Sequence, residues 1–288
     1  MFSKKRVSTE CFIAALILMA FAAFVTIQLP TTAYASEILY SNDGTSFWGE
    51  GTPIPSSETI YWDNYVVHDE YLVDQAPSYG VAGSVENFCA PAAGTNIIGF
   101  YDRFYPNLIP NFEPGMMNSG HYWYLPDMNF APVAQTFNEL YDLMGTNQNG
   151  AGTSGEQFKN GLKTFVNNHG YDLTYGSFYQ NRTGVNINAL NGMIVSNKVG
   201  VLLCTKYNFV YSISHGSNET YISKSDYTLA HMMMVYGYIM VDYYKDGNIF
   251  RSDTYLQVSS GYSTGDQGYV LVNNNSMEIQ EALIVNIS

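Results

Sequence analysis

The sequence predicts an α+β fold in which helices come first and a largely antiparallel sheet follows. Between residues 89 and 195, apolar residues recur at helical spacing, whereas from residue 199 onward they alternate or form continuous runs, as strands do. Strands and helices do not alternate as βαβ units, which favours antiparallel over parallel pairing. The chain has 288 residues, 46% of them apolar and 13% charged, and is therefore apolar enough to bury a core.

Residues 1–35 have the pattern of an export signal. Three basic residues, Lys4 to Arg6, precede an uncharged apolar run from Cys11 to Val25, and a small-residue cleavage site ends at Ala35. An uncleaved anchor is the alternative, because Cys11 to Leu29 would nearly span a bilayer. We expect cleavage, and hence a secreted, extracellular or cell-surface protein with no membrane segment in its mature form.

Residues 36–80 mix Ser, Gly, Pro, Asp and Tyr, a composition typical of loops with one or two strands. Their clearest strand signal is the run Tyr65–Val67. We interpret this stretch as an N-terminal extension, either a propeptide or a permanent part of the protein. It precedes a main domain at residues 81–288, for which we expect a monomer.

The first predicted helix begins at Cys89. Pro91 falls in its first turn, where the missing N–H costs nothing, and Pro106 ends it. A further helix follows Ser154, which has capping-box spacing to Gln157, and ends at Gly170. Two others are predicted at residues 133–144 and 187–194.

The second half of the main domain predicts strands rather than helices. Its apolar residues have period two or form short continuous runs bounded by turn residues. The predicted strands are Val199–Tyr207, Tyr227–Val241, Asp253–Ser259, Gly268–Val272 and Ala282–Ile287.

Charge and ligand spacing exclude several classes of function. The chain carries 12 Lys+Arg against 25 Asp+Glu, a net charge of −13, so it lacks the basic surface that nucleic-acid binding needs. The histidines other than His231 have no metal-ligand spacing, and we predict no metal or other cofactor. These histidines are His68, His121, His169 and His215.

Three cysteines form at most one disulfide within the chain, which is too few to stabilise a protein of this length, so the protein is not a disulfide scaffold. Cys11 leaves with the signal peptide. Cys204 lies in the apolar run Val201–Cys204 and is predicted to be a core residue. The remaining thiol, Cys89, stands at a predicted helix N-terminus, where the helix dipole and free N–H groups favour a thiolate. A small buried side chain is the simpler interpretation of Cys89.

His231 in a late strand makes Cys89 a candidate nucleophile, because an imidazole can take the thiol proton and later protonate a leaving group. The two residues are 142 positions apart, inside the window of about 130–150 for papain-type enzymes. The sequence resembles bacterial papain-like cysteine peptidases, in particular relatives of the double-glycine (bacteriocin-leader) peptidases. Four ordered segments, spanning roughly residues 80–275, carry the resemblance: Asn87–Arg103, Asn191–Cys204, Ala230–Tyr238 and Tyr255–Tyr269.

The resemblance implies a papain-like fold, with Cys89 at a helix start and the helices packed on the C-terminal sheet. It also implies a third catalytic residue near Ser260, where the family has Asn or Asp. A serine can accept the imidazole N–H but supplies no charge to stabilise imidazolium. Asp253, Asp242 or Asn273 would have to replace it through a different loop path.

The oxyanion-stabilising glutamine of the family would fall on Gly83. Asn87 is the nearest amide that could help, beside the Cys89 backbone N–H. Phe88 also stands where the family usually has Gly, which could crowd a substrate cleft. These departures keep a catalytically degenerate member of the family open.

The sequence thus predicts a secreted cysteine peptidase that acts on a peptide or protein substrate through Cys89, His231 and Ser260. One alternative is a non-catalytic surface or binding protein that keeps the papain-like fold. Its binding surface would be a Tyr-rich loop such as Gly120–Tyr124. A cell-wall amidase that uses the same pair of residues ranks last, because its Asp-Cys-Ser-Gly pattern is missing from the sequence.

Overall fold

A computed structural model describes residues 54–73, 76–80, 85–112, 115–116, 122–123, 131–148, 152–262, 267–272 and 277–288. All of them lie in one compact unit, Thr45–Ser288. The predicted signal peptide lies outside the described residues, as do Gly83, His121 and Asn273. Among the described residues, no helix is both long and apolar enough to cross a bilayer.

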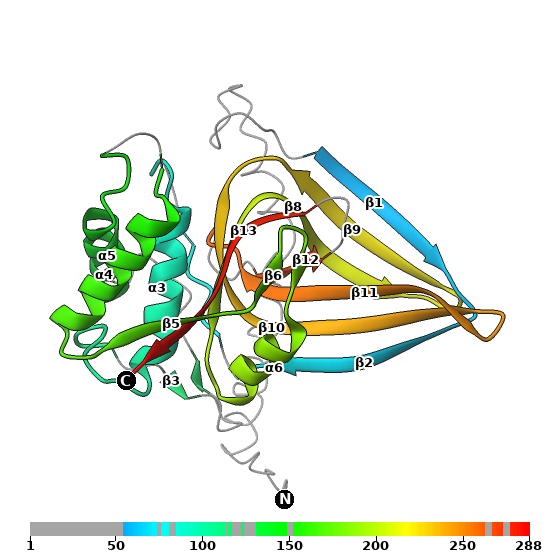
Figure 1. Cartoon of the computed structure of the whole chain (residues 1–288), viewed down its shortest axis with the longest axis horizontal. Coiled ribbons are helices and arrows are strands. Elements are labelled where there is room, and N and C mark those ends of the chain that lie inside the picture. The colour runs from blue at the N-terminus through cyan, green and yellow to red at the C-terminus, as the bar shows by residue number, and fades with distance from the viewer. Residues whose placement is uncertain are drawn as a thin grey trace, which may run out of the picture. The chain divides into compact units, whose positions relative to one another are not determined.

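A nine-stranded sheet forms the centre of this unit, and all its pairings are antiparallel (Figure 1). The strand order is β1-β9-β8-β12-β11-β10-β2, and β13 pairs with both β5 and β8. The α+β class with a large antiparallel sheet is therefore confirmed. The strands are β1 (Ile54–Tyr61), β2 (Asn64–Leu72), β5 (Leu173–Ser177), β8 (Gly200–His215), β9 (Glu219–Tyr227), β10 (His231–Lys245), β11 (Asn248–Ser259), β12 (Gln267–Val272) and β13 (Glu278–Ile287). Two small ribbons pair β3 (Gly115–Met116) with β4 (Tyr122–Trp123), and β6 (Tyr179–Asn181) with β7 (Gly184–Val185).

The long strands β8 and β10 close part of the sheet into a ring, because they pair with each other as well as with β12 and β11. They pair directly where they begin, with His231 opposite Cys204 and Val235 opposite Gly200. Further along, β12 pairs with β8 and β11 pairs with β10, so β11 and β12 fill the space between the two diverging strands. His231 therefore lies where β8 and β10 pair directly.

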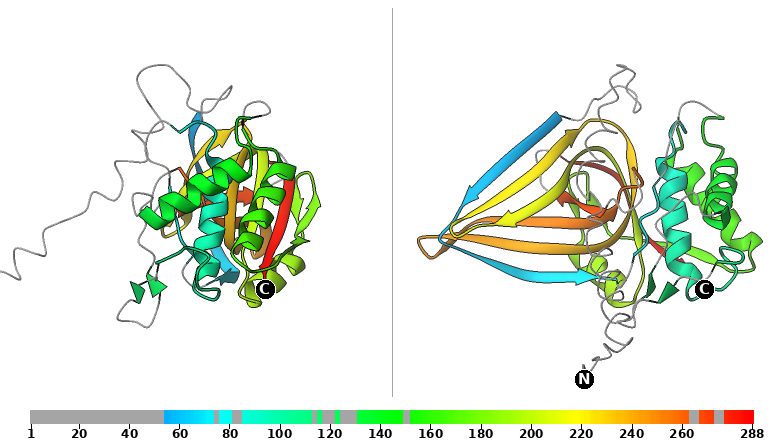
Figure 2. Two further views of the ribbon diagram at one scale, coloured as in Figure 1. Left: turned by 90° about the vertical axis from the view of Figure 1, so that its left-hand side faces the viewer. Right: turned by 180° about the vertical axis from the view of Figure 1, so that it is seen from behind.

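All four predicted helices are present: α3 (Cys89–Asp102), α4 (Ala131–Leu143), α5 (Gly155–Asn168) and α6 (Ile187–Val195). The capping box that begins α5 is complete, because Ser154 accepts from the Gln157 N–H and Gln157 accepts from the Ser154 N–H. Helices α3, α4 and α5 lie together, and α3 packs against β10 (Figure 2).

Helix α3 is the central helix, and every residue after Cys89 is buried. Its small residues make this possible. A Cβ built on Gly94 would lie 3.0 Å from the Met144 side chain, and one on Gly99 would lie 2.6 Å from the Tyr79 ring. These close contacts bury α3 from Ala90 to its end. At its first residue the helix reaches solvent, since Cys89 is part-exposed.

Two differences from the predicted strands have a physical cause. The predicted strand Tyr227–Val241 is two strands, since Tyr227 ends β9 and His231 begins β10. Strand β9 itself was not predicted, because its alternation Tyr221, Ser223, Ser225 carries too few apolar residues to signal a strand. Its partners β1 and β8 supply the hydrogen bonds that keep it extended.

The predicted extension at residues 36–80 contributes two strands to the sheet. Strand β1 pairs with β9 along its whole length, and β2 pairs with β10. The segment after β2 crosses to α3, where Asn96 accepts from the Tyr79 N–H and donates to the Tyr79 carbonyl, at 2.6 and 2.9 Å. This segment thus joins the sheet to α3, the helix that begins at Cys89.

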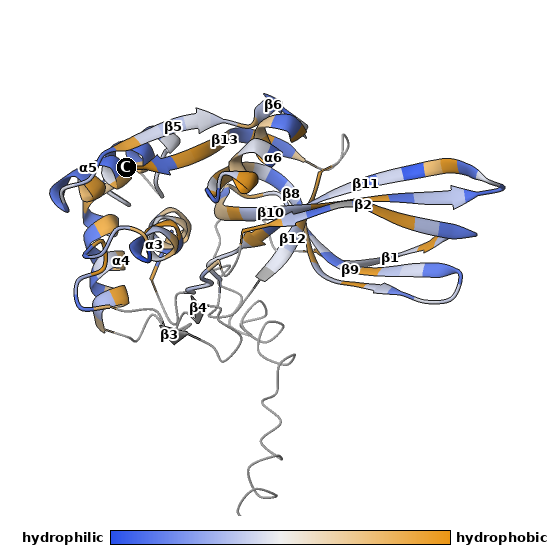
Figure 3. Cartoon of the chain, turned by 90° about the horizontal axis from the view of Figure 1, so that it is seen from below, coloured by the Kyte–Doolittle hydropathy of each residue, from blue (hydrophilic) through white to orange (hydrophobic). Residues whose placement is uncertain are grey.

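The core has two parts. The larger one lies between the helices and the sheet and includes Phe100, Phe158 and Met233, all fully buried. Strand β13 joins it and is coloured as hydrophobic in Figure 3. A smaller cluster around Trp62, Tyr243 and Tyr255 lies on the other face of the sheet. The larger core is the one that supports Cys89 and His231.

Candidate active site

Cys89 is the first residue of α3, and the turn before it explains its orientation. Asn87 has a left-handed backbone, with φ 55°, and Phe88 returns to the right-handed region at φ −76°. Successive N–H groups in such a turn point into one concavity. The Phe88 carbonyl then accepts from the Ala92 N–H at 2.9 Å, which starts the helix. The Phe88 side chain is buried in the core, 3% exposed, in spite of the expectation that it would crowd a cleft.

His231 is the first residue of β10 and is fully buried. Its Nε2 lies 2.8 Å from the backbone carbonyl oxygen of Ser260, just beyond the end of β11. A carbonyl oxygen can only accept, so Nε2 carries the proton and Nδ1 carries the lone pair. The ring is therefore held in the tautomer that can receive a proton at Nδ1.

Three observations bring the Cys89 sulfur close to His231. The backbone N–H of Met232, the residue after His231, is among the groups that lower the Cys89 pKa. Tyr207 and Tyr262 both stack on the His231 ring, and the charge of a Cys89 thiolate raises the pKa of each of them. The Cys89 sulfur therefore lies at the start of β10, beside the backbone of the residue that follows His231.

Two tyrosines pack against the His231 ring, and sequence reasoning did not find them. The Tyr262 ring is stacked on it at 4.3 Å between centroids, and the Tyr207 ring at 5.9 Å. Their hydroxyl groups are 2.6 Å apart, which ties β8 to the segment after β11. Only the position of Tyr262, two residues after Ser260, could have drawn attention to it. Together they fix the plane of the imidazole ring.

Burial sets the protonation states of the pair. It raises the pKa of the Cys89 thiol, and the N–H groups of Met232, Ala90 and Cys89 offset only part of this effect. Burial also lowers the pKa of His231 to about 4, while the hydrogen bond to Ser260 opposes it. The resting pair is thus a neutral thiol beside a neutral imidazole.

Comparisons with family models, curated proteins and solved structures find no match to this chain. The site has to be interpreted from its own residues.

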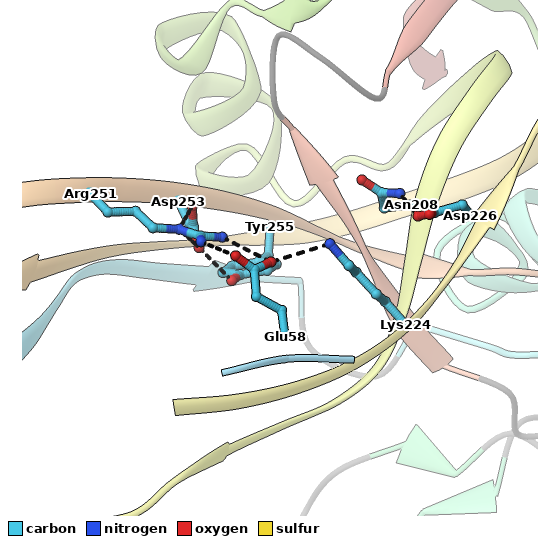
Figure 4. Close-up of polar contacts among 7 residues, drawn as sticks. All are labelled: Glu58, Asn208, Lys224, Asp226, Arg251, Asp253 and Tyr255. Atoms are coloured by element: carbon cyan, nitrogen blue, oxygen red, sulfur yellow. Dashed lines mark hydrogen bonds and ion pairs between the residues drawn. The ribbon is translucent and has the colours of Figure 1, made fainter. Parts of the chain in front are cut away.

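The side-chain alternatives to Ser260 lie elsewhere in the sheet. Asp242 is eleven residues beyond His231 on β10, which is roughly 35 Å of strand. It accepts from the Ser252 hydroxyl and lies against His68. Asp253 is paired with Val241 and accepts from Arg251 and Tyr255, each at 2.8 Å (Figure 4). Neither carboxylate is therefore placed to orient the imidazole.

The Asn87 amide, the proposed substitute for the missing glutamine, is used in another contact. Its Nδ2 donates to Asn147 Oδ1 at 2.7 Å, in the turn after α4. The groups that lower the pKa of the Cys89 thiol are backbone N–H groups, those of Cys89 and Ala90 among them. Any oxyanion stabilisation at this turn therefore rests first on the backbone.

The other thiol, Cys204, and the histidine His169 each have a structural environment within the fold. Cys204 is a free thiol and fully buried, as predicted for a core residue, and burial raises its pKa. His169 caps α5, and its Nδ1 is 2.8 Å from the Phe165 carbonyl oxygen. In the part of the chain that the structure describes, no three His, Cys, Asp or Glu side chains are grouped to hold a metal ion.

Gly261 directly follows Ser260, whose carbonyl contacts His231. It has φ 78°, and a Cβ built on it would lie 3.0 Å from the Ala92 side chain of α3. The Gly261→Ala variant should lose about 1–2 kcal/mol of unfolding free energy, because alanine is strained in this region. It should also lower any turnover at the site by about tenfold, since a shift of the order of 1 Å misplaces the imidazole.

The matched control is Gly170→Ala. Gly170 has φ 87° and no atom within 4 Å of a built Cβ, so it carries the same backbone strain far from the site. It should lose a similar unfolding free energy in urea and keep its turnover. Equal turnover in the two variants would contradict a role for Gly261 in orienting Ser260.

Proposed function

We propose that this protein is a secreted cysteine peptidase that uses Cys89 as nucleophile and His231 as general acid and base. The observation that carries the proposal is the Cys89–His231 pair, with His231 Nε2 held by the Ser260 carbonyl oxygen at 2.8 Å. The four segments that resemble papain-like peptidases support it. Ser260-Gly261-Tyr262 stands at the Asn-Ser-Trp position of that family, with a backbone carbonyl in place of the amide side chain.

The chemistry follows from the neutral resting pair. The Cys89 sulfur attacks a peptide carbonyl carbon while its proton passes to His231 Nδ1, and the N–H groups of the turn stabilise the oxyanion. Collapse of this intermediate breaks the C–N bond, and His231 returns the proton to the departing amine. Water then attacks the thioester with His231 as base, which releases the carboxylic acid and restores the thiol.

The alternative, a binding protein that keeps the fold without turnover, is favoured by one observation. Burial disfavours the charged form of both Cys89 and His231, so a preformed ion pair is not the resting state. In that case Cys89→Ala leaves ligand binding unchanged. Digests of casein and, separately, of peptidoglycan separate a peptidase from a binding protein and from a cell-wall amidase.

Iodoacetamide labelling of the folded protein tests the pair directly. Cys89 should react at least tenfold faster than Cys204, because Cys204 is fully buried. The His231→Gln variant should slow labelling of Cys89 at least tenfold, because glutamine can still donate to the Ser260 carbonyl but cannot take the thiol proton. Peptide mapping by mass spectrometry gives both rates. Equal, slow labelling of the two cysteines would exclude an activated nucleophile.

A further inference from the structure

The turn that carries Cys89 is attached to a second element, the connection between α4 and α5. Asn147 lies there with a left-handed backbone, φ 64°. Its Oδ1 accepts from Asn87 Nδ2 at 2.7 Å and from the Gly152 N–H at 2.8 Å. One side chain thus binds the nucleophile turn on one side and the start of the α5 segment on the other.

The same amide also reaches the residue before Asn87. Asn147 Nδ2 donates to the Tyr141 hydroxyl at 2.7 Å and to the Glu86 carbonyl at 3.4 Å. Tyr141 in turn donates to the Glu86 carbonyl at 3.3 Å. Residues 86 and 87 are therefore held from two directions by side chains of the α4 end, although 55 or more positions separate them in sequence.

We infer that Asn147 is a positioning residue for the oxyanion-binding turn, an inference that rests on the proposed peptidase function. The left-handed Asn87 followed by right-handed Phe88 sets the direction of the Cys89 N–H. The contacts of Asn147 keep Asn87 in that conformation. Asn147 thus takes over, through the backbone, the part of oxyanion stabilisation that a side-chain amide supplies in the enzymes this sequence resembles.

The test uses Asn147→Gly, because glycine accepts the left-handed backbone and removes only the side chain. We expect kcat for a peptide substrate to fall about 10- to 100-fold, with KM within about threefold. Alkylation of Cys89 by iodoacetamide should change less than threefold, because that reaction forms no oxyanion. Asn147→Asp keeps both accepting contacts and should restore most of the lost kcat.

Asn107→Gly is the matched control, since Asn107 is an exposed left-handed asparagine, φ 81°, in the loop after α3. It should leave kcat unchanged. The double variant Asn87→Gly/Asn147→Gly should be no slower than the slower single variant, because both substitutions remove one shared contact. A multiplicative loss, an unchanged kcat in Asn147→Gly, or a parallel loss of alkylation and thermal stability would each overturn the inference.

Binding of a dipeptide aldehyde gives a readout that does not need turnover. The Cys89 sulfur adds to the aldehyde carbon, the thiol proton passes to His231, and the carbonyl oxygen becomes an oxyanion. The wild type should bind the aldehyde at least tenfold more tightly than Asn147→Gly. A wild type that binds no aldehyde overturns both proposals, whereas equal affinity in the two proteins overturns only the role of Asn147.

Discussion

The Cys89→Ala variant is expected to lose peptide hydrolysis by about 10⁴-fold or more, because no other atom at the site can form the acyl intermediate. Its thermal unfolding should fall only slightly below that of the wild type, since Cys89 packs against the larger core but is part-exposed, and alanine removes a single atom there. Release of peptides from casein at saturating enzyme, followed over hours, measures the loss.

Cys204→Ala is the control for this experiment. Cys204 is fully buried opposite His231, so alanine leaves a small cavity and lowers stability by about 1–2 kcal/mol. It should retain hydrolysis at temperatures below its unfolding transition. Hydrolysis that survives in Cys89→Ala would remove Cys89 from the reaction and contradict the proposed mechanism.

Acidification from pH 6.5 to 4 is expected to destabilise the wild type, relative to His231→Gln, by about 3 kcal/mol. His231 has a pKa of about 4 when folded and 6.5 as its ordinary value. Between these values the unfolded chain binds more protons, so stability rises with pH. The contribution of His231 is fully present above pH 6.5 and is lost as the pH falls through 4.

A neutral glutamine has no such dependence, and it can still donate to the Ser260 carbonyl oxygen. Asp102 acts in the opposite direction, because burial raises its pKa from 3.8 to about 6 and so favours the folded state at low pH. Both proteins retain Asp102, so its contribution cancels in the difference. Urea denaturation at half-unit steps of pH measures both curves, and parallel curves would show that His231 is solvated when folded.

The helices could be predicted because their signals are local. The capping box of Ser154 and Gln157 and the proline-bounded segment after Cys89 each specify a helix within one or two turns of sequence. Strands β1 and β2 depend on partners that are distant in the chain, and β9, which also forms a hairpin with β8, is polar along one face. Their pairing decides their conformation, so short-range periodicity could not identify all of them.

The candidate site likewise contains residues that the sequence could identify and groups that only the structure reveals. Cys89 and His231 could be singled out because thiol and imidazole are rare groups with recognisable chemistry. The partner of His231 could not, because it is the main-chain carbonyl of Ser260, and a carbonyl is present at every residue. The stacked tyrosines and the contacts of Asn147 likewise join segments that lie far apart in sequence.

The sequence by itself determined the α+β class, the helix that begins at Cys89 and the two side chains that could react. Only the tertiary structure decided which groups surround them and in which protonation state they rest. The reason is physical. Burial and long-range pairing control the pKa of Cys89 and of His231, and both depend on how α3 packs against β10 rather than on neighbouring residues in the chain.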